Sequence, residues 1–213
     1  MIEDIPDLDL FMMCPQLDRR ALSPLPVGYH IRNCRKDEYE TWKAFPFDNP
    51  GEADAYADFM TEFFQSTYGG QEDLFFANTL YVCDHNDKPI ATCLLWKAYG
   101  LFNTIHWLKV VKEKEGLGIG RALLSALLQD LPDTAFPIYL HTQPGSYRAI
   151  KLYADFGFTI LTDPVIGTRT NDWGACRPIL QQYMPKEAFA SLRTCSAPAF
   201  FIQQLANFET VEF

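Results

Sequence analysis

The sequence lacks the features of secreted and membrane-spanning proteins. No apolar run approaches the roughly 18 residues of a membrane helix, and the acidic N-terminus has neither the basic start nor the long apolar stretch of a signal peptide. The six cysteines form no CxxC or CxH spacing, so no local zinc site is predicted. We therefore expect a soluble, cytoplasmic protein with reduced thiols and no metal or membrane contact.

An excess of positive charge is also missing. The net charge is -9, which disfavours binding to a phosphate backbone, so we expect no nucleic-acid partner. The charge is uneven: residues 1–73 hold 15 acidic and 6 basic side chains, and residues 74–213 hold 12 of each. This acidic first third is either a solvated surface or a surface that faces a cationic substrate or partner.

The chain shows no internal repeat and no low-complexity linker. It has 213 residues, 48% hydrophobic and 15% aromatic, which is typical of a globular protein with a substantial core. We expect one domain over residues 1–213. The cysteines of two apolar, strand-like runs, Cys83 and Cys93, are expected to be buried thiols.

Residues 29–111 combine helical and strand-like patterns. Apolar residues recur at helical spacing from Glu52 to Tyr68, which predicts one helix with Tyr56, Met60 and Phe63 on its inner face. Short turns between the apolar runs that follow favour an antiparallel meander. We expect helices at Asp37–Phe45 and Glu52–Tyr68, and strands at Tyr29–Arg32, Phe75–Cys83, Ile90–Ala98 and Thr104–Val111.

After residue 116 the pattern changes to alternating helices and strands. Such alternation predicts at least one parallel pairing through a crossover. The predicted fold class is therefore α/β (α+β with a mixed sheet): a central sheet of parallel and antiparallel strands flanked by helices. We expect helices at Arg121–Leu131, Tyr147–Phe156, Pro178–Met184 and Pro185–Leu192, strands at Phe136–Thr142 and Phe158–Leu161, and one or two terminal strands within Phe200–Phe213.

A glycine-rich loop, Glu115–Arg121, lies between an expected strand and an expected helix. Glycines allow positive φ and close backbone approach, and the unpaired N–H groups of a helix start attract anions. Nearby basic side chains make a phosphate or pyrophosphate the natural ligand, although a tight turn without a ligand has the same glycines. The loop is neither a P-loop nor a Rossmann fingerprint, because Gly120 precedes Arg121-Ala122 and the spacing is GxGxG.

Two motifs in order resemble those of the GCN5-related N-acetyltransferases. Val110–Leu124 is similar to the family's acyl-CoA pyrophosphate loop, [QR]-x-x-G-x-[GA], and Ser146–Phe158 is similar to N-x-x-A-x-x-L-Y-x-x-x-G-F. The resemblance covers about residues 29–161, with an N-terminal extension at 1–28 and a C-terminal extension at 162–213. Two departures are Glu115, where the family has Gln or Arg, and Ser146, where it has Asn.

The resemblance implies an acyltransferase that uses acetyl-CoA. The backbone of Leu108–Val110 would pair with the pantetheine arm in a splay between the strands at 104–111 and 136–142, and the Val110 N–H would face the thioester carbonyl. Backbone amides of the loop would hold the pyrophosphate. The implied cofactor-binding residues are Leu108, Val110, Gly116, Leu117, Gly118, Ile119, Gly120 and Arg121.

Acyl transfer to an amine also needs an acid for the leaving thiolate and a base for the attacking ammonium. Tyr153 matches the family's thiolate-protonating tyrosine, although Tyr153 also fits an ordinary apolar helix face. His141 and His106 are candidate bases, and each is also compatible with a packing role. Glu52, Asp54 and Asp58 could serve directly or through water.

We expect an N-acetyltransferase acting on a primary amine, such as a cationic small molecule or a peptide. The alternative is a non-catalytic acyl-CoA-binding sensor or interaction module, which Glu115 and the lack of an obvious base leave open. A nucleotide-binding protein is a third interpretation. The sequence names neither the acceptor, the acyl length nor the oligomeric state, monomer or homodimer.

Overall fold

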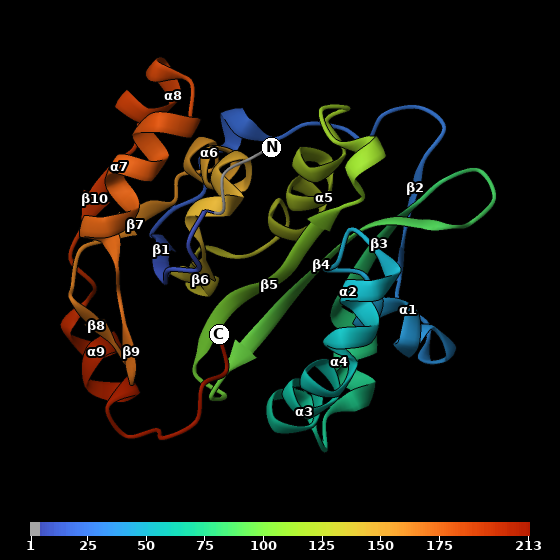
Figure 1. Cartoon of the computed structure of the whole chain (residues 1–213), viewed down its shortest axis with the longest axis horizontal. Helices are drawn as coiled ribbons and strands as arrows, with labels where there is room; N and C mark the ends of the chain where they lie inside the picture. Colours follow the sequence, from blue (N-terminus) through green and yellow to red (C-terminus); the bar gives the residue numbers. More distant parts are fainter. Residues whose placement is uncertain (1–4) are drawn as a thin grey trace. The chain divides into compact units, whose positions relative to one another are not determined.

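The computed structural model describes residues 5–213, which form two compact units (Figure 1). Unit 1 contains the N-terminal residues up to Arg20, residues 132–211 and Phe213. Unit 2 contains residues 21–131 and Glu212. Each unit contains both strands and helices and is described by itself.

The strands of unit 2 form an antiparallel meander, as predicted. β2 (His30–Asn33) pairs with β3 (Thr79–Cys83), β3 pairs with β4 (Pro89–Ala98), and β4 pairs with β5 (Phe102–Val110). The short β3–β4 turn is held by the Asp84 N–H, which donates to the Lys88 carbonyl at 3.0 Å. Local turns of this kind impose antiparallel order on neighbouring strands.

The helices of unit 2 differ from the expected ones in two places. The single helix expected from Glu52 to Tyr68 is broken at Tyr56, whose φ of -103° and ψ of 7° interrupt the helix. The strand expected from Phe75 starts only at Thr79, because a helix precedes it and buries Phe75 against Trp42. The helices are α1 (Tyr39–Ala44), α2 (Pro50–Ala55), α3 (Ala57–Tyr68), α4 (Glu72–Asn78) and α5 (Ile119–Leu128).

The sheet of unit 1 is mixed and includes a strand that the sequence patterns did not predict. β1 (Leu10–Cys14) pairs antiparallel with β6 (Ile138–Thr142) on one side and with β7 (Thr159–Leu161) on the other. β7 also pairs in parallel with β10 (Thr194–Cys195). All five residues of β1 are buried, so the N-terminal segment is part of the core of unit 1.

The C-terminal part of unit 1 is mainly helical. The terminal strands expected in Phe200–Phe213 are wrong: a helix buries Phe201 and Leu205, one turn apart, and Phe201 stacks on Tyr139 with ring centroids 3.8 Å apart. The Pro178 expected at a helix start lies inside a longer helix. The elements are α6 (Tyr147–Asp155), α7 (Trp173–Tyr183), α8 (Lys186–Ala190), α9 (Ala199–Leu205) and the hairpin β8 (Val165–Ile166) and β9 (Arg169–Thr170).

The core of unit 2 is rich in aromatic side chains. Trp42 is fully buried and its ring meets those of Phe64, Tyr68 and Phe75 at centroid distances of 4.9–6.1 Å. Among the described residues, no helix is both long and apolar enough to cross a membrane.

Short 3-10 helices connect several elements of both units. They are η1 (Arg19–Ala21), η2 (Lys36–Glu38), η3 (Lys112–Lys114), η4 (Asp133–Ala135) and η5 (Pro144–Ser146).

Candidate functional site

The glycine loop of unit 2 has the backbone conformation that only glycine adopts readily. Gly116 and Gly118 have φ of 78° and 81°, and Gly118 is the N-cap of α5. A Cβ built on either residue meets no atom within 4 Å, so backbone conformation rather than crowding requires glycine here. The loop is exposed up to Gly118, and Ile119 is the first buried residue of the helix.

The same loop presents a row of unused backbone donors. The first helical hydrogen bond of α5 runs from the Ala122 N–H to the Gly118 carbonyl at 3.0 Å. Within the described part of the chain, the N–H groups of residues 116–120 donate no hydrogen bond. Unpaired amides at the start of a ten-residue helix favour an anionic ligand, and the helix dipole acts in the same direction.

The basic side chains near the loop are only partly available. Lys109 is paired with Asp48 at 2.6 Å, and a guanidinium N–H of Arg121 donates to the Ala21 carbonyl at 3.2 Å. Lys114 lies over the Tyr29 ring at 5.8 Å. Lys109 and Arg121 are therefore engaged within unit 2, whereas the amides of residues 116–120 donate to no group in the described part of the chain.

Strand β5 contains a β-bulge at the predicted arm-binding segment. His106 pairs with Leu94 and Lys109 pairs with Thr92, so Trp107 and Leu108 both lie opposite one residue of β4. Trp107 has a φ of 55°, a conformation that costs a non-glycine residue about 1–3 kcal/mol unless its surroundings impose it. Of the predicted arm-binding residues, Leu108 lies in the bulge and Val110 lies after it, paired with Ala91.

A buried hydrogen-bond network holds this bulge. The Trp107 indole N–H donates to the Tyr68 hydroxyl at 3.1 Å, and the Tyr68 hydroxyl lies 2.7 Å from Nδ1 of His106. Nε2 of His106 lies 2.9 Å from the Thr104 hydroxyl, which donates to the Trp96 carbonyl at 3.1 Å. Both ring nitrogens of His106 are therefore engaged inside unit 2, and Tyr68 is a residue that the sequence patterns gave no reason to select.

The second motif forms α6 and the start of β7 in unit 1. Tyr153 is buried at 6% exposure and its ring lies 5.6 Å from that of Phe158. Gly157 has a φ of 100°, and a Cβ there would lie only 2.7 Å from the Gln16 carbonyl. Glycine is therefore required at position 157, because the backbone of the N-terminal segment leaves no room for a side chain. Ser146 is the N-cap of α6 without a capping hydrogen bond from its side chain.

His141 lies on β6 within a polar cluster of unit 1. Its Nε2 is 2.8 Å from Oδ1 of Asp9 and 2.8 Å from a terminal nitrogen of Arg169, and Arg169 also donates to Asp9. Burial, together with the Arg169 charge, lowers the pKa of His141 to about 4. His141 is therefore neutral at pH 7, and its Nε2 is in hydrogen-bond contact with both Asp9 and Arg169. Asp9 and Arg169 are far from His141 in sequence, and no motif pointed to them.

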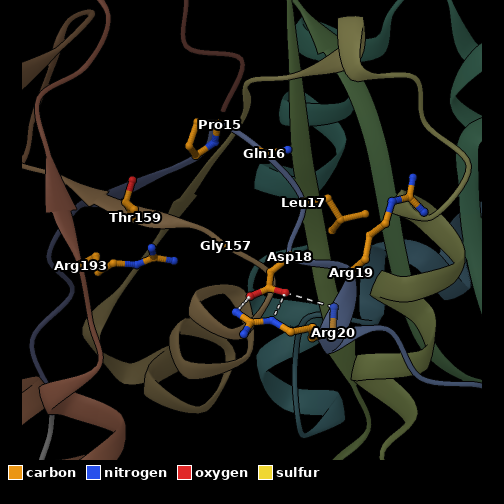
Figure 2. A pocket seen from close by; sticks show the side chains of 9 residues that line it. All are labelled: Pro15, Gln16, Leu17, Asp18, Arg19, Arg20, Gly157, Thr159 and Arg193. Carbon is orange, nitrogen blue, oxygen red and sulfur yellow. Dashed lines mark hydrogen bonds and ion pairs between the residues drawn. The ribbon is translucent and has the colours of Figure 1, made fainter.

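Unit 1 also has a shallow pocket of about 480 Å³ with a charged rim (Figure 2). Asp18 and Arg20 pair at 2.6 Å, and Arg193 reaches toward the pocket from the segment before β10. Hydrogen bonds and charge from Arg20 lower the pKa of Asp18 to about 2. The pocket contains Gly157 but none of the predicted cofactor-binding residues. Its lining residues are Pro15, Gln16, Leu17, Asp18, Arg19, Arg20, Gly157, Thr159 and Arg193.

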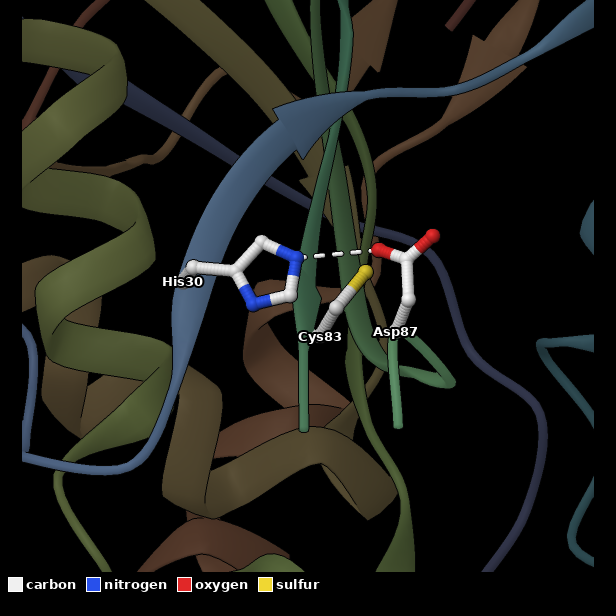
Figure 3. A group of neighbouring side chains, drawn as sticks. All are labelled: His30, Cys83 and Asp87. Atoms are coloured by element: carbon white, nitrogen blue, oxygen red, sulfur yellow. Dashed lines mark hydrogen bonds and ion pairs between the residues drawn. The ribbon is translucent and has the colours of Figure 1, made fainter. Parts of the chain in front are cut away.

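One cluster in unit 2 has the residue types of a metal site (Figure 3). The ligand atoms of His30, Cys83 and Asp87 all lie within 4.8 Å of one another. However, the Asp87 carboxylate also binds Arg32 at 2.8 Å and Arg35 at 2.6 Å. Burial raises the pKa of the Cys83 thiol to about 11, so the thiol is protonated at pH 7. We assign this cluster to an ion-pair network that ties β2 to the β3–β4 turn.

Solved structures show the same type of fold. An acetyltransferase of the GNAT family from Colwellia psychrerythraea aligns with a TM-score of 0.51 at 18% identity, covering 73% of this chain and 53% of that one. A tandem GNAT protein from the clavulanic acid biosynthesis pathway aligns with a TM-score of 0.54 at 14% identity, covering 73% and 50%. The matched part of this chain therefore spans about half the length of both structures.

The family comparison covers both motif regions. No curated protein matches the chain significantly. The model of the acetyltransferase (GNAT) family matches residues 37–158, which is more than half of the chain and includes the glycine loop, β5 and α6. The chain therefore belongs to the acetyltransferase (GNAT) family.

Proposed function

We propose that the protein is an N-acetyltransferase that moves an acetyl group from acetyl-CoA to a primary amine of a small molecule or a peptide. The observation that carries the proposal is the row of unused N–H groups at residues 116–120, at the start of α5 and inside the region matched by the family. A pyrophosphate is an anion of suitable size and charge for such a row.

The proposed roles of the chain's residues follow from their chemistry. Acetyl-CoA supplies an activated thioester. The amides of Gly116–Arg121 bind its pyrophosphate, and the backbone of Leu108 and Val110 binds the arm. The Tyr153 hydroxyl donates a proton to the departing thiolate sulfur, and burial of its ring holds the side chain in one rotamer.

His141 is proposed as the base with a specific condition. Its low pKa keeps the imidazole neutral, as a base must be. Its Nε2, however, lies 2.8 Å from both Asp9 and Arg169, so proton uptake from a substrate at this atom requires these two contacts to be displaced. A water-relayed role for the exposed carboxylates Glu52, Asp54 and Asp58 avoids this rearrangement.

A non-catalytic acyl-CoA-binding protein is the second candidate function. Two observations favour it. The Glu115 carboxylate lies beside the loop, and the ring nitrogens of His141 and His106 that could act as a base already form hydrogen bonds within the chain. A carboxylate about 4 Å from a phosphate costs about 1 kcal/mol in water and several near a protein surface. Weakened coenzyme binding without turnover is the behaviour expected of such a protein.

The test is a thermal-unfolding titration followed by an assay for thiol release. Acetyl-CoA at a hundredfold excess over its Kd is expected to stabilise the folded chain by about 2.7 kcal/mol. ATP and NAD at the same concentration serve as controls and should leave Tm unchanged. No shift with acetyl-CoA overturns the proposal. A shift without CoA release in the presence of an amine library selects the non-catalytic alternative.

A further inference from the structure

A row of aromatic rings in unit 2 joins Phe47, which precedes α2, to Tyr56 at the N-cap of α3 and to rings on α3 itself. Phe47 stacks on Tyr56 with centroids 5.2 Å apart and planes 13° apart. Tyr56 meets Phe59 edge-on at 6.5 Å, and Phe59 lies 6.4 Å from Phe63. The row ends where Phe63 meets Trp107 of β5 at 5.1 Å, in the strand proposed to bind the pantetheine arm.

Much of this row faces solvent. Tyr56 is 52% exposed and Phe59 is 54% exposed, and Phe47 and Phe63 are half-buried. The pattern in the sequence had predicted an inner position for Tyr56, but the break between α2 and α3 turns its ring outward. Contiguous exposed aromatic side chains are uncommon on a monomer and mark surfaces that bind something.

The charge around the row has one sign. Residues 45–64 contain five carboxylates and neither Lys nor Arg. Asp48 is neutralised by Lys109 at 2.6 Å. Among the described residues, the other four carboxylates form no ion pair, and all four are exposed. They are Glu52, Asp54, Asp58 and Glu62.

On α3 the rings and the carboxylates form adjacent rows. Phe59 and Phe63 are four residues apart, and so are Asp58 and Glu62. Across the two rows, Phe59 and Glu62 are three residues apart, a spacing that places two side chains about 5–6 Å apart on one helix face. A ligand with a single ring and a short chain to an ammonium group matches these dimensions: the ring packs on the aromatic row and the ammonium meets a carboxylate.

We propose that this aromatic and acidic surface, defined by Phe47, Tyr56, Phe59, Phe63, Asp58 and Glu62, binds a small cationic amine that carries an apolar ring or chain. The inference rests on the proposed function in one respect, since it takes the bound amine to be the acyl acceptor. Aromatic faces attract ammonium groups, and unpaired carboxylates raise their local concentration. The surface discriminates against anionic and purely polar amines.

The test uses 2-phenylethylamine in a ligand-observed NMR titration of the full chain, with and without saturating CoA. Ethylamine lacks the ring and 2-phenylethanol lacks the charge, so both are expected to bind more weakly. Phe59→Ala is expected to weaken 2-phenylethylamine binding roughly two- to fivefold, the value of one exposed cation–π contact. The double variant Asp58→Asn, Glu62→Gln is expected to weaken binding up to about fivefold at low salt and less at high salt.

Two substitutions elsewhere provide matched controls. Phe200→Ala removes an equally exposed ring, and Glu187→Gln removes an exposed carboxylate; neither should alter binding. Equal binding of the three probes, or equal effects of test and control variants, overturns the inference. So does concentration-dependent self-association that Phe59→Ala abolishes, because a second copy would then be the occupant.

The outcomes separate this inference from the proposed function. If 2-phenylethylamine fails to bind with or without CoA while acetyl-CoA still raises Tm, the surface assignment is wrong and the acetyltransferase proposal stands. If 2-phenylethylamine binds at the predicted residues but acetyl-CoA has no effect on Tm, the surface stands without the acyl-transfer role.

Discussion

The Tyr68 hydroxyl, 2.7 Å from Nδ1 of His106, determines the direction of a complete hydrogen-bond chain. The Thr104 hydroxyl donates to a carbonyl, so it must accept from Nε2–H of His106. Nδ1 is then an acceptor, Tyr68 is its donor, and the Tyr68 oxygen accepts from Trp107. Burial raises the pKa of Tyr68 well above its usual value, which keeps this donor protonated.

Tyr68→Phe is expected to destabilise the protein by about 1–3 kcal/mol. The substitution keeps the ring but removes the hydroxyl that contacts Nδ1 of His106 and accepts from the indole N–H of Trp107. Denaturant unfolding measures the change, with Tyr56→Phe on the surface as the control. A loss below about 0.5 kcal/mol, the usual surface effect, would show that the network is not required.

Gly118→Ala is expected to lower the free energy of unfolding by about 1–2 kcal/mol, because the left-handed conformation at the N-cap of α5 is strained for alanine. It should also reduce the Tm shift produced by acetyl-CoA. Gly145→Ala is the control, since Gly145 has ordinary φ and open space around its Cα. Equal effects of the two substitutions on stability would contradict the assigned strain.

Tyr153→Phe is expected to lower kcat by a factor of about 10²–10⁴ if the hydroxyl protonates the thiolate. The ring stays in place, so stability and the affinity for acetyl-CoA should change little. Steady-state kinetics and a thermal titration separate the two effects. Tyr147→Phe on the same helix is the control, and an unchanged kcat in Tyr153→Phe would leave Tyr153 with a packing role only.

His141 makes stability depend on pH in a defined window. Its pKa is about 4 in the folded chain and 6.5 ordinarily, because burial and Arg169 oppose its charge. The unfolded chain therefore takes up this proton first as pH falls, so stability decreases from about pH 6.5 to pH 4, by about 3 kcal/mol in total.

His141→Gln removes this titrating group and should flatten the pH dependence of unfolding between pH 6.5 and 4. Urea unfolding at several pH values measures the slope, and His85→Gln, in the exposed β3–β4 turn, is the control. The same slope in wild type and in His141→Gln would contradict the assignment. Protonation of Asp9 reduces the free energy of unfolding only at lower pH. Burial raises the pKa of Asp9, but Arg169 and His141 outweigh burial and lower this pKa overall.

Met12→Ala is expected to cost about 2–5 kcal/mol, the usual range for truncating a buried methionine. Met12 is fully buried in β1, paired with Leu140 on one side and Ile160 on the other. Val27→Ala, at a fully exposed position, is the control. Chemical denaturation gives both values, and a small effect at Met12 would argue that β1 contributes little to the core of unit 1.

The sequence predicted the parts of the protein that depend on local pattern. The meander, the glycine loop and α6 are correct because turn residues, glycine spacing and helical periodicity act over a few neighbours. Cys83 and Cys93 are buried as predicted. The break at Tyr56 and the helix before Thr79 were missed. In the second case, packing of Phe75 on Trp42 overrides the weak strand preference of the segment.

Relationships between distant residues were beyond local patterns. Asp9 and Arg169 meet His141 only in the folded sheet, and the five-residue β1 has an apolar composition that fits a buried strand or a helix equally well. Trp107, whose φ is positive, contacts Tyr68 and Phe63 on α3, which lie 39 and 44 positions earlier in the chain. The sequence around Trp107 contains no local pattern that predicts a positive φ at this residue.

The position of β1 between β6 and β7 has a consequence for biosynthesis. On the ribosome, β1 emerges before its pairing strands, which are made only after the whole of residues 21–131. At about 5–20 residues per second, the apolar segment Leu10–Cys14 waits many seconds for its partners. We expect this nascent segment to depend on chaperones, and synthesis from a circularly permuted gene that places β1 after β10 to shorten the wait.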